Sequence, residues 1–183
     1  MAYFGSVVLP LKSIDRDGSV LSLGTFSKVL FPGPRVGSIT ASAELVERLS
    51  KIRNLSDDGG SVVMQATLNE LCRSGAYQRH LELVNKICAR RMRAALDALS
   101  RYVPREKASW ITPNGGFLIW LTLAHTGVTE DELRARLRAR GVEAKPGSGS
   151  FIRPQKNLHL RLSISSHEEE QIVEGIRRLG EAL

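Results

Sequence analysis

Four side chains that could act together lie within a short stretch of the sequence. The apolar run Val20–Leu23 predicts a strand. Thr25, Ser27 and Lys28 follow this run, and Arg35 comes after a Pro-Gly-Pro turn. A lysine amine is a nucleophile when nearby cations or burial lower its pKa, and arginine offers a rigid fork for a phosphate. The combination predicts a site that binds a phosphorylated aldehyde as a Schiff base.

Lys28 also has a purely structural interpretation. Lys28 taken alone fits a lysine at a strand end with its ammonium in water. The hydroxyls of Thr25 and Ser27 and the guanidinium of Arg35 favour the chemical interpretation, because they supply donors and charge beside the amine.

Arg161 is a second candidate. Strict alternation over residues 158–165 places it with His159 and Ser163, opposite a face of leucines. On that face it either lies in solvent or lines a cleft, where its guanidinium would bind a substrate carboxylate in a bidentate manner. The alternation supports both interpretations equally.

Three further residues are weaker candidates. Tyr3 could place a phenol against the ring oxygen of a cofactor, although a tyrosine beside Phe4 also suits a core. Asn114 and Gly115 could let the backbone approach a ligand, although a plain hairpin turn explains them equally well. The four histidines show no metal-ligand or triad spacing, and we predict no metal site.

Composition limits the class of protein. With 183 residues, 42% hydrophobic and 25% charged, the chain fits a soluble globular protein, and no apolar run approaches the roughly 20 residues that span a membrane. The net charge of +7 lies largely on the helix-like stretches 89–93 and 134–140, and aromatic residues are only 5%. We therefore predict solvated helix faces and no nucleic-acid binding. Cys72 and Cys88 show no metal spacing, which favours a reduced, cytoplasmic protein.

Periodicity and turn signals predict the elements that position these residues. A small layer of helices on a mainly antiparallel sheet is predicted for the second half. The predicted strands are the run before Lys28 and residues 36–41, 108–112, 116–123, 142–144 and 158–165, with a hairpin-type turn at 113–115. The predicted helices are 43–54, 62–73, 78–101, 129–140 with a capping box at 129–132, and a last helix to 183 with a capping box at 166–169.

Residues 23–28 and 32–37 together closely resemble the cofactor-lysine signature of class I/II (fold type I) aminotransferases, which depend on pyridoxal 5'-phosphate. The similarity is to the subgroup of aminoadipate, kynurenine, aromatic and multisubstrate aminotransferases and aminotransferase-like regulators. Residues 113–121, 141–148 and 160–163 resemble its later landmarks, in the right order.

The resemblance implies an α/β fold, with residues 1–75 the closing part of the large cofactor-binding domain and 76–183 the complete small α+β domain. It implies transfer of an amino group between an amino acid and a 2-oxo acid, in a homodimer. By the same resemblance, Lys28 is the Schiff-base lysine and proton carrier, and Thr25, Ser27 and Arg35 bind the cofactor phosphate. Tyr3 donates to the cofactor's phenolic oxygen. Arg161 binds the substrate α-carboxylate, and Asn114 and Gly115 also contact the substrate.

Members of this family are more than twice as long, and the resemblance places their additional part upstream. The aspartate that pairs with the pyridine nitrogen would fall one position before Met1. We therefore expect a fragment, or a misassigned start, with little or no catalysis by this chain alone. The alternative function is a cofactor-sensing effector domain of a transcription regulator, and a third possibility is a structural or dimerisation piece without a ligand.

Overall fold

The computed structural model describes residues 3–4, 9–57, 59–124 and 127–183. The chain divides into two compact units: unit 1 comprises Met1–Gly5 and Asn85–Leu183, and unit 2 comprises Ser6–Val84. This division falls inside helix α3 (Ala76–Tyr102). The domain boundary at residues 75–76 stays a prediction.

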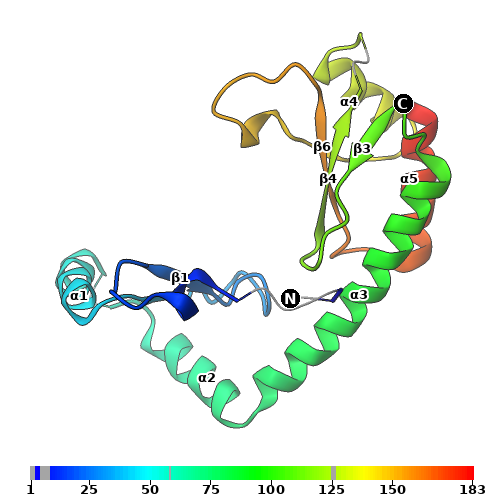
Figure 1. Ribbon diagram of the computed structural model, residues 1–183. Coiled ribbons are helices and arrows are strands. Elements are labelled where there is room, and N and C mark those ends of the chain that lie inside the picture. The colour runs from blue at the N-terminus through cyan, green and yellow to red at the C-terminus, as the bar shows by residue number, and fades with distance from the viewer. Residues whose placement is uncertain (1–2, 5–8, 58, 125–126) are drawn as a thin grey trace. The chain divides into compact units, whose positions relative to one another are not determined.

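Unit 2 contains a two-stranded antiparallel sheet and helices (Figure 1). The sheet pairs β1 (Ser22–Thr25) with β2 (Gly37–Thr40), and the helices are the short η1 (Leu11–Ile14), α1 (Ala43–Asp57), α2 (Val62–Arg73) and the first turns of α3. The predicted strands and helices are confirmed here. Helix α2 begins where the Ser61 hydroxyl accepts from the Met64 N–H, and it ends before Gly75, whose φ of +71° suits glycine.

The apolar residues of unit 2 are mostly exposed. Among its described residues, Leu68 is the only hydrophobic side chain in the buried core. On the β1–β2 sheet, Leu23 is 72% exposed and Ile39 is 47% exposed. The local structure of this unit therefore depends on turns, caps and backbone pairing more than on a core of its own.

Unit 1 is a layer of helices on an antiparallel sheet, as predicted. The strand order is β3 (Ala108–Trp110), β4 (Leu118–Leu123), β6 (His159–Ser163) and β5 (Lys145–Pro146). The helices are the later part of α3, α4 (Glu130–Ala139), the short η2 (Ser148–Ser150) and α5 (Glu169–Ala182). Figure 1 shows α5 and this part of α3 along one side of the sheet.

The core of unit 1 lies between the sheet and these helices. Alternate residues of β4, namely Ile119, Leu121 and Leu123, are fully buried, while Trp120 and Thr122 between them are half-buried. The helices contribute residues at three- and four-residue spacing. The largest fully buried side chains are Met92, Leu99, Ile119, Leu121, Leu123, Leu137, Leu160, Ile164 and Leu179.

Two local predictions are wrong because the backbone forms other hydrogen bonds. Residues 142–144 form no strand, since the Val142 N–H bonds back to Leu137 O at the end of α4, and pairing with β6 begins only at Lys145. Residues 113–115 form no tight hairpin turn, because Asn114 O instead accepts from the N–H groups of Tyr3 (2.9 Å) and Phe4 (3.1 Å). The antiparallel pairing of β3 with β4 is confirmed.

The two predicted capping boxes differ in outcome. The box at Thr129 and Glu132 is confirmed by both reciprocal hydrogen bonds. The last helix begins later than predicted, with Glu168 as its cap and Gln171 bonded to the Glu168 N–H at 3.2 Å. Arg91 of α3 bonds Ser165 O and Glu168 Oε1, and this holds the preceding segment out of the helix.

Two glycines of α5 predict opposite responses to alanine. A Cβ on Gly180 would lie 2.1 Å from Tyr102 O, whereas a Cβ on Gly175 would meet nothing within 4 Å. Gly175→Ala should raise the free energy of unfolding by about 0.5–1 kcal/mol, because alanine is the better helix former. Gly180→Ala should lower it by about 1–3 kcal/mol through overpacking. Urea unfolding measures both, and a change of the same sign in the two variants would contradict this packing.

Candidate functional site

A close approach of two glycines positions the loop that carries Lys28. Gly24 of β1 pairs with Ser38, and Thr25 pairs with Gly37 of β2. A Cβ on Gly37 would lie 2.8 Å from Gly24 O, and one on Gly24 would lie 2.5 Å from Ser38 Oγ. A side chain at Gly37 would therefore meet the backbone of β1 and push the strands apart, whereas one at Gly24 would meet the rotatable hydroxyl of Ser38.

The chain turns sharply after β1. The Ser27 N–H donates to Thr25 Oγ1 at 3.2 Å, and the N–H groups of Val29 and Leu30 both donate to Phe26 O. Lys28 lies within this turn and is exposed, while Ser27 is half-buried. The structure thus brings Thr25, Ser27 and Lys28 together in one short turn at the strand end.

Helix α3 holds this turn from the side. His80 Nε2 lies 2.9 Å from Val29 O, and because a carbonyl only accepts, Nε2 must carry the proton. The Tyr77 ring contacts the Phe26 ring edge-on at 5.5 Å. Sequence reasoning missed His80, because 51 residues separate it from Val29 and no local pattern joins the two.

Arg35 adopts an unusual backbone conformation. Its φ of +52° lies in the left-handed region, and it is the only non-glycine residue with a positive φ among those the structure describes. This conformation costs a side-chain-bearing residue roughly 1–2 kcal/mol. Next to it, Val36 O accepts from the Phe26 N–H at 3.4 Å, which ties the arginine turn to the lysine turn.

Positive charge at this strand end is not balanced locally. Lys28 and Arg35 are both exposed, and neither side chain has a hydrogen bond or ion pair with any residue in the described part of the chain. Two cations and two hydroxyls on one pair of turns suit a doubly charged anion such as a phosphate ester. They supply the donors that the predicted phosphate site requires.

The segment leading into β1 is fixed by Asp15. Its carboxylate accepts from Lys12 Nζ (2.7 Å), the Ser19 N–H (3.1 Å) and the Val20 N–H (3.3 Å). The Lys12 ammonium, with help from the Val20 N–H, lowers the pKa of Asp15 to about 2. This carboxylate therefore organises the loop from which the lysine strand emerges.

Tyr3 belongs to unit 1 and is held by the segment around Asn114. Its backbone N–H donates to Asn114 O, and its hydroxyl donates to Gly116 O. Burial, followed by the adjacent Cys88 thiol, raises the pKa of Tyr3 above its usual range. The phenol therefore keeps its proton and acts as a donor.

The remaining predicted residues also lie in unit 1. Arg161 sits on β6 opposite Trp120 of β4 and is half-buried, with no side-chain partner among the described residues. Asn114 is exposed and Gly115 is half-buried, in the connection between β3 and β4. The structure joins Tyr3 to Asn114 by a hydrogen bond, and it shows no such bond from Arg161 to either.

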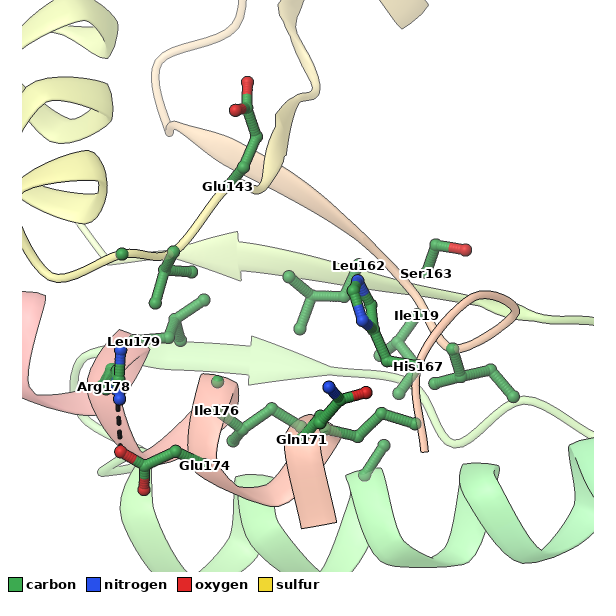
Figure 2. Close-up of a pocket in the computed structure, with 16 residues that line it drawn as sticks. Ile119, Glu143, Leu162, Ser163, His167, Gln171, Glu174, Ile176, Arg178 and Leu179 are labelled. Atoms are coloured by element: carbon green, nitrogen blue, oxygen red, sulfur yellow. Dashed lines mark hydrogen bonds and ion pairs between the residues drawn. The ribbon is translucent and has the colours of Figure 1, made fainter. Parts of the chain in front are cut away.

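A cavity of about 390 Å³ lies on the other face of this sheet. Ile119 and Leu162 of the sheet and Ile176 and Leu179 of α5 supply much of its apolar wall (Figure 2). The carboxylate of Glu174 bonds Arg178 at 2.7 Å, so its charge is already neutralised. No predicted site residue lines this cavity, and it is separate from the candidate site.

Comparison with known proteins identifies the family. Residues 3–179 match the family of class I and II aminotransferases. Because this match covers nearly the whole chain, the protein belongs to that family. The resemblance predicted from the lysine signature is therefore confirmed, and the α/β fold with it.

The similar proteins include enzymes and regulators. The 2-aminoadipate transaminase of Thermus thermophilus is 35% identical, over 99% of this chain and 46% of its own. An uncharacterized HTH-type transcriptional regulator of Bacillus subtilis, YdfD, is 34% identical, over 93% of this chain and 35% of its own. The crystal structure of LysN, an alpha-aminoadipate aminotransferase from Thermus thermophilus, superposes with a TM-score of 0.87 at 34% identity, over 100% of this chain and 47% of that one. The chain thus spans less than half the length of these relatives.

Residues 3–4, 9–57, 59–124 and 127–183 contain neither a metal-binding cluster nor a membrane-spanning helix. No group of three or more histidine, cysteine or acidic side chains is placed to hold a metal ion. No helix there is both long and apolar enough to cross a membrane.

The contact of His80 with the lysine turn can be tested by removing it. His80→Ala should destabilise the turn by about 0.5–1.5 kcal/mol, since one hydrogen bond is lost. Native-state hydrogen exchange at the Leu30 amide, which bonds Phe26 O, measures this opening. His167→Ala is the control, because His167 has no bond to this turn. Equal exchange in the wild type and His80→Ala would show that the histidine does not support the turn.

The Asp15 contacts predict a dependence on pH. The folded-state pKa of about 2 lies below the unfolded value of about 3.9, so the stabilisation is fully present above about pH 4 and is lost as the pH falls through 2. Carbon-13 NMR of the Asp15 carboxyl, together with the Ser19 and Val20 amide signals, should show one transition near pH 2. Lys12→Met should move that transition upward. A wild-type transition near pH 4 would contradict the proposed contacts.

Proposed function

We propose that the protein carrying this chain transfers an amino group between an amino acid and a 2-oxo acid with pyridoxal 5'-phosphate as cofactor. The observation that carries the proposal is the strand-end arrangement of Lys28, Thr25, Ser27 and Arg35, in a chain of the class I and II aminotransferase family. Support comes from LysN, which was solved with N-(5'-phosphopyridoxyl)-L-leucine.

The residues present fit this cofactor. Thr25 and Ser27 offer hydroxyls, and Arg35 offers an exposed guanidinium, beside a lysine amine that has no competing carboxylate in the described chain. The positive φ of Arg35 supports a functional role, because an arginine retained in a conformation that glycine adopts more easily needs a compensating interaction. A bound phosphate dianion would provide that interaction.

The chemistry divides between the cofactor and the protein. When bound, the cofactor supplies an aldehyde for the amine and a ring that withdraws electrons from the substrate. Lys28 Nζ would be the amine that holds the cofactor, and it would accept and return the proton that moves during the transfer. Thr25, Ser27 and Arg35 would hold the phosphate and so orient the ring.

We assign the substrate side to unit 1. Arg161 would bind the α-carboxylate with its guanidinium fork, and Asn114 and Gly115 would border the substrate. Tyr3 would donate to the cofactor's phenolic oxygen, and for this its one hydroxyl proton, which its raised pKa maintains, would leave the Gly116 carbonyl that now accepts it. We further propose a homodimer in the cytoplasm, and the two free cysteines, Cys72 and Cys88, agree with a reducing compartment.

A second candidate function is a cofactor-sensing domain of a transcription regulator. It is favoured by one observation, the 34% identity to the HTH-type regulator YdfD over 93% of this chain. Such a domain would use the same lysine to bind the cofactor, without turnover of an amino acid. Cofactor binding with no turnover in the whole protein would support this function over the first.

Covalent trapping tests the cofactor site. The chain is incubated with pyridoxal 5'-phosphate, reduced with borohydride and mapped by peptide mass. We expect the label on Lys28 and its loss in Lys28→Ala, because this amine alone lies beside the hydroxyls and Arg35. Arg35→Met should weaken labelling by pyridoxal 5'-phosphate about tenfold, since a charged hydrogen bond is lost, but not labelling by pyridoxal.

Lys51→Ala is the matched control, because Lys51 is an exposed lysine of the same unit that pairs with Glu47 at 2.8 Å. It should keep the Lys28 label unchanged. Labelling spread evenly over surface lysines, or unchanged in Lys28→Ala, would overturn the proposed cofactor site.

A further inference from the structure

The turn that carries Lys28 has few restraints of its own. Within it, the N–H groups of Val29 and Leu30 both donate to Phe26 O, at 3.2 and 2.9 Å. No packed core supports these bonds, because Leu68 is the only hydrophobic side chain in the buried core among the described residues of unit 2. A segment with few buried contacts and exposed backbone hydrogen bonds opens easily. Contacts from outside the turn therefore decide how firmly Lys28 is held.

One face of α3 supplies two such contacts. Tyr77 and His80 are three positions apart, so their side chains lie on the same face of the helix. The Tyr77 ring contacts the Phe26 ring edge-on at 5.5 Å, and His80 Nε2 lies 2.9 Å from Val29 O. Phe26 precedes Lys28 by two positions, and Val29 follows it directly. The helix thus holds the backbone on both sides of the lysine.

The start of α3 is fixed independently of the lysine turn. Ser74 and Gly75 form the corner between α2 and α3, and the φ of Gly75 is +71°. The Arg79 N–H donates to Gly75 O at 3.2 Å, and the Arg79 guanidinium donates to Ser74 O at 3.3 Å. His80 follows Arg79 directly, in the second turn of the helix. Its imidazole is therefore carried by a regular helix whose first turn is bonded to the corner.

The imidazole acts as a donor in this contact and not as a base. Both the neutral ring with its proton on Nε2 and the doubly protonated ring can donate to Val29 O. The contact therefore does not require His80 to gain or lose a proton. This leaves proton transfer to Lys28 and gives the histidine a geometric role.

Geometry matters here because the amine has to meet one carbon atom of an aldehyde that is anchored elsewhere. In the proposed function, Thr25, Ser27 and Arg35 hold the phosphate, and the aldehyde carbon must come within bonding reach of Lys28 Nζ. A displacement of about 1 Å can slow a reaction between positioned groups by about 100-fold. The hold of α3 on the turn therefore bears directly on the reaction of the amine.

We propose that His80 is a positioning residue for the Schiff-base lysine. By holding Val29 O, it keeps the Lys28 amine where an aldehyde anchored by its phosphate can react with it. In that step a carbon–nitrogen double bond forms, and the aldehyde oxygen leaves as water with the two protons of the neutral amine. His80 acts only through the turn. The inference rests on the proposed function, in which Lys28 bonds to the cofactor.

Two substitutions separate the hydrogen bond from the shape of the ring. His80→Phe keeps a ring but removes the donor, and His80→Gln keeps an N–H donor. Each chain is incubated with pyridoxal 5'-phosphate and reduced with borohydride, and the label on Lys28 is followed over time by peptide mass. His80→Phe should lower the rate of labelling about fivefold, because one hydrogen bond is lost, and His80→Gln should restore most of it.

Two further probes distinguish loss of position from general damage to the site. Inorganic phosphate, followed by NMR at the Arg35 guanidinium, should bind equally to the wild type and to His80→Phe, because the phosphate donors remain. Acetic anhydride should acetylate Lys28 equally in both, since this reagent is not anchored and the amine is exposed. His167→Phe is the control, because His167 is an exposed histidine of unit 1, and it should label like the wild type.

The failures of the two proposals are distinguishable. Equal labelling of Lys28 in the wild type and His80→Phe, or the same loss in His80→Gln as in His80→Phe, would overturn the positioning role and leave the cofactor site intact. Weaker phosphate binding in His80→Phe would also overturn it, because the whole site would then be disturbed. A wild-type label spread evenly over surface lysines would reject the proposed function, and the positioning role with it.

Discussion

The candidate cofactor site depends on the close approach of β1 and β2 at Gly24 and Gly37. A side chain at Gly37 would meet Gly24 O and separate the strands, and the turns that follow β1 and precede β2 would move apart with them. Those two turns carry Lys28 and Arg35, and the Phe26–Val36 hydrogen bond joins them. His80 and Asp15 add contacts from α3 and from the lead-in loop, which matters because unit 2 has little buried core to fix the turns by packing.

Uncompensated positive charge is the feature that both units share. Among the described residues, Lys28 and Arg35 of unit 2 and Arg161 of unit 1 have no carboxylate partner. Arg48, Arg91 and Arg178 each have one. A cation without a carboxylate partner keeps its charge available to an anionic ligand. A phosphate in one unit and carboxylates in the other are the anions that the proposed amino-group transfer requires.

Much of the secondary structure and most of the candidate site residues could be predicted from the sequence, because the patterns that indicate them are local. The helices follow from their periodicity, and the start of α4 follows from the Thr129 capping box. The alternation around Arg161 indicates which residues of β6 share a face of the sheet. The errors arose where a distant partner decides the local structure. The N–H groups of Tyr3 and Phe4 donate to Asn114 O, so no tight turn forms there. Arg91 bonds Glu168, and α5 begins later than its local sequence predicts. His80 was missed for the same reason, because its contact with Val29 joins residues far apart in the chain.

The most direct measurement is a crystal structure of the protein with pyridoxal 5'-phosphate. We expect continuous density from Lys28 Nζ to the cofactor, with the phosphate bound by the hydroxyls of Thr25 and Ser27 and by the guanidinium of Arg35. Density joined to another lysine, or a phosphate bound away from Arg35, would contradict it.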